Sequence, residues 1–314
     1  MAREVVALLG GAHRVLDGTL GGGGHSLALL ESGATVTGID RDPDALRAAR
    51  SRLSTFEQDG RFRAFLSTFS DLDSVPALAG ARFAGILLDL GISSHQFDDP
   101  ERGFSFREGA PLDMRMGLGH RDNEGASADA ASGNRVAERD AREILSDAPE
   151  EEISRILHEY GDETMARRMA REIVRRRANR PFDTSDDLVG AIRAVLGPRS
   201  GPGDFARIFQ AFRIAVNDEL GGLARALPAL RDRLEPEGVL AVIAYHSGED
   251  RMVKQTFRAW SADCICPPRQ MHCTCRGRAL GETLTRKPAV AAADEAARNP
   301  RARSAHLRAW RSGK

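Results

Sequence analysis

A glycine-rich segment near the start of the chain carries the pattern best suited to binding a nucleotide. Residues 17–26 read DGTLGGGGHS, after a strand-like run and before helical sequence. Glycines let the backbone approach a ligand closely, and the free amides that begin a helix attract a carboxylate or a phosphate. Asp40 ends the next strand-like run, where a carboxylate can accept hydrogen bonds from both hydroxyls of an adenosine ribose. Together these features predict a cofactor that contains adenosine.

Two cofactors of this kind fit the segment. A dinucleotide fold uses G-x-G-x-x-G, whose third glycine lets the helix pack closely on the strand. Counted from Gly21, the third glycine position is occupied by Ser26. Asp17, directly before the loop, stands where methyltransferases place an acid. The pattern therefore favours S-adenosyl-L-methionine over NAD, and the strand–loop–helix context argues against a connector without a ligand.

A second polar segment follows a buried run. Residues 85–90 are apolar except for Asp89, and the polar loop that comes next contains Gln96. In a doubly wound sheet, ligands lie beyond the carboxyl ends of the strands. Asp89 and Gln96 are therefore predicted to meet the cofactor or the substrate, although Asp89 taken alone could equally cap the next helix.

The elements that must position these residues alternate between strands and helices. Strand-like runs occupy residues 13–17, 35–40, 62–66 and 85–90. Asp42 and Pro43 are typical of a helix N-terminus, because Asp caps the free amides and Pro needs no amide donor there. Strands separated by helices indicate βαβ units and a parallel sheet, hence an α/β fold.

Helical sequence interrupts this pattern after residue 106. Apolar positions at helical spacing run through 137–177, and a short helix is predicted to end at 196. A Gly/Pro linker follows at 197–203, and then a long predicted helix at about 205–234. A turn at 235–238 leads into a further strand at 239–244. We therefore expect a discontinuous α/β domain with a parallel-type central sheet, residues 1–108 and 205–314. Residues 109–204 are expected to form an inserted, mainly helical domain.

The composition is that of a globular protein with no overall charge bias. The chain has 314 residues with 45 basic and 45 acidic side chains, so a nucleic-acid partner would need a local basic surface. Its apolar runs are too short for a signal peptide or a membrane span, and we expect a cytoplasmic protein.

All four cysteines lie between Cys264 and Cys275. This clustering fits reduced thiols, a small metal site or a local redox pair better than a disulfide framework. Four thiols suit tetrahedral zinc, but C-x-C is tighter than the common C-x2-C. The sequence alone therefore commits us to no metal.

Several segments resemble the ribosomal RNA small subunit methyltransferase H family. They are residues 17–26, 39–43, 87–94, 101–106, 111–116, 209–217, 246–251 and 299–304, and the similarity runs from about residue 4 to the C-terminus. The resemblance implies a Rossmann-like class I methyltransferase that uses S-adenosyl-L-methionine to methylate N4 of a cytidine in the decoding region of 16S rRNA. It implies the small ribosomal subunit as partner, and we leave a homodimer open. Tyr245 and Gly248 depart from the Phe and Leu that are commoner in the family beside His246.

The resemblance also implies a set of cofactor-binding residues. They are Gly23, Gly24, His25, Asp40, Phe69, Asp89 and Gln96. Phe69 follows the third strand-like run, where its ring could flank the adenine. Without the resemblance, a core position would be the favoured interpretation of Phe69.

Methyl transfer to the exocyclic amine of cytosine needs groups that accept its hydrogens, because the lone pair is delocalised into the ring. Many amino-methyltransferases carry an Asp/Asn-Pro-Pro-Tyr loop after the fourth strand, whereas residues 89–92 read DLGI. Asp113 and His246 are the candidate catalytic acceptors, since a neutral His could take up the released proton. The alternatives are an ion pair between Asp113 and Arg115 and a hydrogen-bonded loop position for His246.

Seven arginines lie between Arg167 and Arg180, and three of them, Arg168, Arg171 and Arg175, form one helical side, the arginine face. Such a run is usually a solvated surface, but clustered cations beside a methyltransferase domain also suit RNA phosphates. Trp310, among the C-terminal arginines, could stack on a base or pack internally.

Two other functions stay open at this point. A non-catalytic RNA-binding or assembly factor would keep the arginine face but would not need residues 23–25 or Asp40. An NAD-dependent oxidoreductase is less favoured, because the third glycine is missing.

Overall fold

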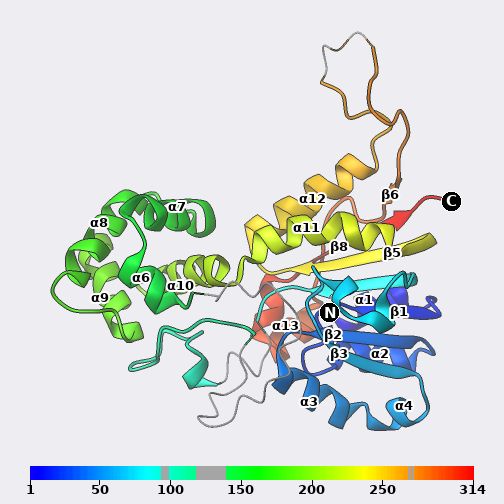
Figure 1. Ribbon diagram of the computed structural model, residues 1–314, viewed down its shortest axis with the longest axis horizontal. Helices are drawn as coiled ribbons and strands as arrows, with labels where there is room; N and C mark the ends of the chain where they lie inside the picture. The colour runs from blue at the N-terminus through cyan, green and yellow to red at the C-terminus, as the bar shows by residue number, and fades with distance from the viewer. Residues whose placement is uncertain (93–98, 118–138, 268–269, 271) are drawn as a thin grey trace. The chain divides into compact units, whose positions relative to one another are not determined.

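The computed structural model describes residues 1–92, 99–117, 139–267, 270 and 272–314 (Figure 1). The chain divides into a sheet unit, Met1–Gly91 with Gly221–Lys314, and a helical unit, Ile92–Leu220. These boundaries differ from the expected ones at 108/109 and 204/205. Helix α10 (Pro202–Asn217) accounts for much of the difference, because Phe205, Ile208 and Phe212 belong to the core of the helical unit.

The sheet unit contains an eight-stranded sheet in the order β3-β2-β1-β4-β5-β8-β6, with β7 paired to β8. The strands are β1 (Arg14–Asp17), β2 (Thr35–Asp40), β3 (Phe62–Leu66), β4 (Phe83–Asp89), β5 (Leu234–Ala244), β6 (Gly281–Thr283), β7 (Ala289–Val290) and β8 (His306–Ser312). Strands β1 to β5 pair in parallel, and β8 is antiparallel to β5. The predicted α/β fold with a mostly parallel sheet is confirmed, whereas the three strands β6 to β8 were not predicted.

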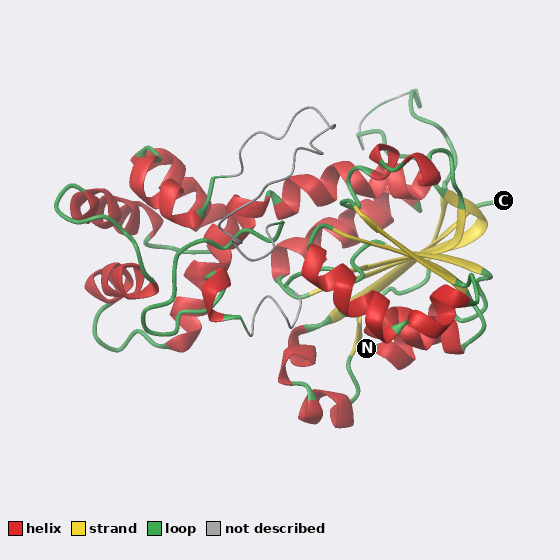
Figure 2. Ribbon diagram, turned by 60° about the horizontal axis from the view of Figure 1, so that its bottom comes forward, coloured by secondary structure: helices red, strands yellow, loops and turns green. Residues whose placement is uncertain are grey.

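Helices cover both faces of this sheet (Figure 2). Successive side chains of a strand point to opposite faces, and Val15 and Leu16 of β1 accordingly belong to two different hydrophobic clusters. The first cluster includes side chains of α1 (Ala2–Leu9), α2 (Gly24–Glu31) and α3 (Pro43–Arg52), and the second includes side chains of α11 (Glu219–Asp232) and α12 (Ser247–Trp260). Burial on both faces explains why β4 and β5 contain continuous apolar runs. The shorter helices of this unit are α4 (Ser54–Gln58) and α13 (Ala293–Arg298), with 3-10 turns at Leu72–Ser74, Pro76–Leu78 and Pro300–Ser304.

The helical unit packs its helices around one apolar core. They are α6 (Ala141–Asp147), α7 (Glu150–Gly161), α8 (Ala166–Arg177), α9 (Ser185–Leu196) and α10, preceded by a 3-10 turn at Pro100–Arg102. The single helical run predicted over 137–177 is divided here, because Pro149 precedes α7 and Asp162 ends it in a left-handed conformation. Asp140 and Glu143 form a capping box that fixes the start of α6.

Two further predictions were wrong. The long helix expected at 205–234 is two helices, because Asp218 adopts a left-handed φ of 45° between α10 and α11. The turn expected at 235–238 lies within β5, where Glu237 has φ 60° and the pairing with β4 shifts register. Between the Phe83–Leu234 and Gly85–Val239 pairs, β5 contains three more residues than β4, and such an irregularity bends the strand locally. In the part of the chain that the structure describes, no helix is long and apolar enough to cross a membrane.

Candidate functional site

A buried acid and a left-handed glycine at the helix start shape the loop between β1 and α2. The Asp17 side chain accepts hydrogen bonds from the Ser26 hydroxyl at 2.7 Å and from the Thr19 amide at 3.2 Å. Asp17 is 1% exposed, and burial raises its pKa to about 6 although the Ser26 hydrogen bond opposes the shift. Gly23 has φ 74° directly before α2, where a residue with a side chain would be strained. The acid thus joins the two ends of the loop, and the glycine makes the turn into the helix.

Asp40 ends β2 and contacts the same loop. Its Oδ2 accepts a hydrogen bond from the Gly21 amide at 2.8 Å, and its Oδ1 accepts one from the Asp42 amide at 2.9 Å. Burial raises the pKa of Asp40 above its ordinary value. Because a carboxylate oxygen can accept more than one hydrogen bond, both oxygens keep acceptor capacity for hydroxyl groups of a ligand.

A hydrogen-bonded set of side chains surrounds Asp89 at the end of β4. Its Oδ1 accepts a hydrogen bond from the Tyr245 hydroxyl at 2.9 Å, its Oδ2 lies 3.3 Å from His25 Nε2, and its amide donates to the Thr19 hydroxyl at 2.6 Å. Burial would lower the pKa of His25, but the hydrogen bond and charge of Asp89 outweigh burial and raise it. Burial and the same carboxylate raise the pKa of the Tyr245 hydroxyl. His25 is therefore favoured in its charged form beside a carboxylate.

Two features of this region suit a bound adenosine-containing cofactor. The Nδ1 atom of His25 is buried and has no hydrogen-bond partner among the residues that the structure describes. Gly18 is crowded, since a Cβ there would lie 2.6 Å from a Leu88 methyl and 3.2 Å from Phe69 Cβ. Phe69, after β3, therefore lies against the glycine-rich loop. These residues fit an adenosine-containing cofactor. Asp40 offers hydrogen-bond acceptors, His25 has a ring nitrogen without a partner, and Phe69 lies beside the glycine-rich loop.

The structure brings together most of the predicted cofactor residues. Gly23 and Gly24 begin α2, His25 contacts Asp89, and Asp40 and Phe69 contact the loop between β1 and α2. Gln96 lies outside the described residues. Tyr245 was not predicted to take part. Its replacement of the commoner Phe was the one available signal, because a hydroxyl added to a buried ring usually finds a partner.

His246 is the N-cap residue of α12. Its Nδ1 accepts a hydrogen bond from the Glu249 amide at 3.4 Å. Its Nε2 lies 3.2 Å from Glu249 Oε1 but lacks hydrogen-bond geometry there. Glu249 is 2% exposed and also accepts a hydrogen bond from the Tyr245 amide at 2.9 Å. The structure thus shows His246 hydrogen-bonded at a helix start, which was the alternative to its catalytic role.

Asp113 lies in the helical unit and forms an ion pair with Arg115. The two oxygens of Asp113 accept hydrogen bonds from Arg115 Nε at 2.8 Å and from its terminal nitrogen at 2.6 Å. These hydrogen bonds raise the pKa of Arg115. The ion pair that was the alternative to a catalytic Asp113 is therefore present, and the catalytic role stays a proposal.

The arginine face lies on the exposed side of α8. The opposite side of the helix buries Met169, Ala170 and Ile173. Arg175 is held by Glu172 through two hydrogen bonds of 2.8 Å, and these, with a further hydrogen bond from Arg176, lower the pKa of Glu172 to about 2. Arg171 lies 3.8 Å from Glu150. The face is thus exposed but partly paired with acids of its own unit.

Trp310 lies on β8 together with two arginines, Arg308 and Arg311. Trp310 is fully buried and packs edge-to-face on Trp260, with the ring centroids 5.1 Å apart. Arg308 is also buried and pairs with Asp250 at 2.6 and 2.9 Å. Internal packing of Trp310, rather than stacking on a base, is confirmed.

The strand order and the glycine-rich loop after β1 define a Rossmann-like methyltransferase fold. The chain belongs to the MraW methylase family, which matches residues 1–312. The ribosomal RNA small subunit methyltransferase H of Gemmatimonas aurantiaca is 62% identical over 98% of this chain and 93% of that protein. The enzyme of the same name from Heliobacterium modesticaldum is 45% identical over 94% of this chain and 90% of that protein. A putative methyltransferase from Streptococcus mutans, solved in complex with SAH, covers 99% of this chain and 96% of its own at 10% identity, with a TM-score of 0.41.

Family membership confirms two of the predictions made from the sequence. The protein is a methyltransferase, and S-adenosyl-L-methionine is the cofactor of the family. The oxidoreductase alternative is thereby excluded.

Proposed function

We propose that this chain transfers a methyl group from S-adenosyl-L-methionine to N4 of a cytidine in the decoding region of 16S rRNA, within the small ribosomal subunit. The observation that carries the proposal is the 62% identity over 98% of the chain to a protein named ribosomal RNA small subunit methyltransferase H. The choice of N4 rests on the resemblance described above.

The carboxyl ends of β2 and β4 supply the proposed cofactor contacts. Asp40 accepts the ribose hydroxyls with the acceptor capacity that the Gly21 and Asp42 amides leave unused. His25, which contacts Asp89 through Nε2, binds the cofactor through its unpaired Nδ1. Phe69 flanks the adenine, and Gln96 is a further contact carried over from the resemblance. The cofactor, when bound, supplies an electrophilic methyl group on its sulfonium.

The protein must orient a weakly nucleophilic amine and accept its proton. Positioning and exclusion of water supply much of the rate in such a reaction. His246 is proposed to accept the released proton, for which it must exchange the hydrogen bond from the Glu249 amide for one from the substrate. Asp113 is proposed to accept a hydrogen of the amine in addition to the three hydrogen bonds that its oxygens accept from Arg115. Proton uptake by His246 therefore requires a local rearrangement when substrate binds.

The arginine face of α8 is proposed to contact RNA phosphates. Arg168 has no hydrogen bond or ion pair to other described residues, and the acids that hold Arg171 and Arg175 are weak competitors at an exposed surface. Phosphate contacts raise affinity without reading sequence. The face would therefore hold the substrate, while the sheet unit holds the cofactor.

A methylation assay with defined substrates tests the proposal. The purified chain is incubated with labelled S-adenosyl-L-methionine and with small subunits whose 16S rRNA lacks the modification, and the rRNA is digested to nucleosides. We expect label in N4-methylcytidine, identified by mass spectrometry against N4- and 5-methylcytidine standards. Label in another nucleoside would overturn the N4 assignment. Tight binding of subunits without methyl transfer would favour the assembly-factor alternative.

A further inference from the structure

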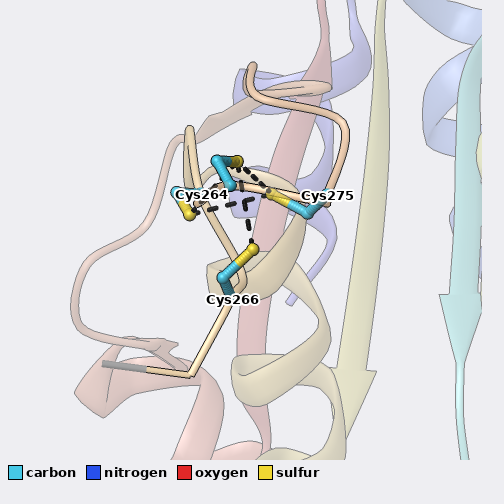
Figure 3. A group of neighbouring side chains, drawn as sticks. Cys264, Cys266 and Cys275 are labelled. Atoms are coloured by element: carbon cyan, nitrogen blue, oxygen red, sulfur yellow. Dashed lines mark hydrogen bonds between the residues drawn. The ribbon is translucent and has the colours of Figure 1, made fainter. Parts of the chain in front are cut away.

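The segment between α12 and β6 carries four thiols that the proposed function does not use. They form two Cys-x-Cys pairs, Cys264 with Cys266 and Cys273 with Cys275. The two pairs come from opposite arms of the loop, and the four sulfur atoms all lie within 4.8 Å of one another. Figure 3 shows the labelled side chains of Cys264, Cys266 and Cys275 directing their sulfurs toward a common centre.

Four of the six distances between the sulfur atoms are close to the edges of a metal–thiolate tetrahedron. The Sγ atom of Cys273 lies 3.8 Å from that of Cys264, 3.9 Å from that of Cys266 and 3.4 Å from that of Cys275, and the Cys264 and Cys275 sulfurs are 3.7 Å apart. A zinc–sulfur bond of about 2.3 Å gives a regular tetrahedron with edges of about 3.8 Å. A disulfide would need sulfurs at about 2.05 Å. We propose that Cys264, Cys266, Cys273 and Cys275 bind one zinc ion in a structural site.

Backbone amides support the same arrangement. The Ile265 amide donates to the Cys275 sulfur at 3.4 Å, and the Thr274 amide donates to the Cys266 sulfur at 3.4 Å. Each Cys-x-Cys pair thus donates one amide to a sulfur of the other pair. Hydrogen bonds of this kind orient metal ligands and stabilise their negative charge. The tight C-x-C spacing, which left zinc undecided from the sequence, is compatible with four converging sulfurs.

The loop has little else to order it. Cys264 and Cys273 face solvent, and so does Ile265, which is 52% exposed. Its base is fixed by Arg276, whose guanidinium donates to the carbonyl oxygens of Ala259, Trp260 and Ala262 at the end of α12. A small segment without an apolar core needs a cross-link, and a structural metal supplies one. The zinc ion therefore closes the loop that leads from α12 into β6.

Metal content of the full chain tests this site. The chain has no other cysteine, so any thiol signal reports on this cluster alone. Elemental analysis of protein purified without chelators should find about one zinc ion per chain, as four thiolates bind one ion. The Cys275→Ser variant should lose most of this zinc. Ile265→Ala, which removes a side chain of the same loop but no ligand, should keep it.

Cobalt exchange gives a readout that does not depend on any variant folding. Replacing zinc by Co²⁺ in the wild-type chain should produce the visible bands of tetrahedral cobalt–thiolate coordination, and added zinc should remove them. Four freely titrating thiols without bound metal would overturn the proposal. So would two disulfides, seen as the loss of four hydrogens in the intact mass, or ferric–thiolate colour in place of zinc.

Discussion

Replacing Asp40 by Ala removes the carboxylate that we assign to the cofactor ribose. The Gly21 and Asp42 amides use one acceptor position on each oxygen, at 2.8 and 2.9 Å, which leaves each oxygen able to accept one ribose hydroxyl. Hydrogen bonds to a charged acceptor contribute about 1.5–3 kcal/mol, so we expect the dissociation constant for S-adenosyl-L-methionine to rise about 10- to 150-fold. Isothermal titration calorimetry measures this directly, with thermal unfolding as the check that the variant is folded.

Asp42→Ala is the matched control. Asp42 is 1% exposed and caps α3 by accepting a hydrogen bond from the Asp44 amide at 2.9 Å. Loss of this cap should cost about 1 kcal/mol of stability and leave the cofactor affinity unchanged. Wild-type affinity in Asp40→Ala would remove Asp40 from the site. Equal weakening in both variants would mean that loop distortion, and not ribose contacts, is being measured.

Three further predictions concern proton transfer, the RNA surface and pH. Asp113→Ala and His246→Ala should each lower the rate in single-turnover assays and keep the affinity for the cofactor, because their contacts matter chiefly in the transition state. A near-normal rate in both variants would mean that other residues accept the hydrogens of the amine. Changing all three residues of the arginine face to Gln should leave cofactor binding intact and raise KM for small subunits. It should also flatten the dependence of log affinity on log salt concentration. An unchanged salt dependence would show that the arginine face is solvated and does not contact RNA. Burial raises the pKa of the Asp17 carboxyl to about 6. The folded state therefore binds the Asp17 proton more tightly than the unfolded state does. Ionised Asp17 destabilises the fold increasingly as pH rises from about 4 to about 6. Asp17→Asn should therefore gain stability relative to wild type, by on the order of 3 kcal/mol between pH 4 and pH 7 in urea unfolding without cofactor, and a pH-independent difference would contradict the assignment.

The central strands could be predicted because they are buried on both faces. Ile86 and Leu240 lie in runs whose apolar character is continuous, and the glycine loop and Asp40 fall at strand ends as the spacing requires. Strand β8 could not be found in the same way. Its Arg308 gives the segment the appearance of a basic surface, and only the ion pair with Asp250, far away in sequence, allows it to be buried.

The parts of the candidate site that the sequence missed are contacts between distant elements. Tyr245 and Asp89 are 156 residues apart in the chain. They form a hydrogen bond only because β4 and β5 are neighbours in the sheet. Glu249 looks like an ordinary acid in the first turn of a helix, yet it is buried between the Tyr245 amide and His246. Residue type and spacing predict which groups can bind a cofactor, but the partners that fix their charge depend on strand order.

The most direct test of the proposed function is the modification state of 16S rRNA in cells. Nucleosides from the 16S rRNA of a strain that lacks this gene, and of the same strain carrying the gene on a plasmid, are compared by mass spectrometry. We predict that N4-methylated cytidine from the decoding region is lost in the first strain and restored in the second. Equal N4-methylation in both strains, or loss of a different modified nucleoside, would contradict the proposed activity.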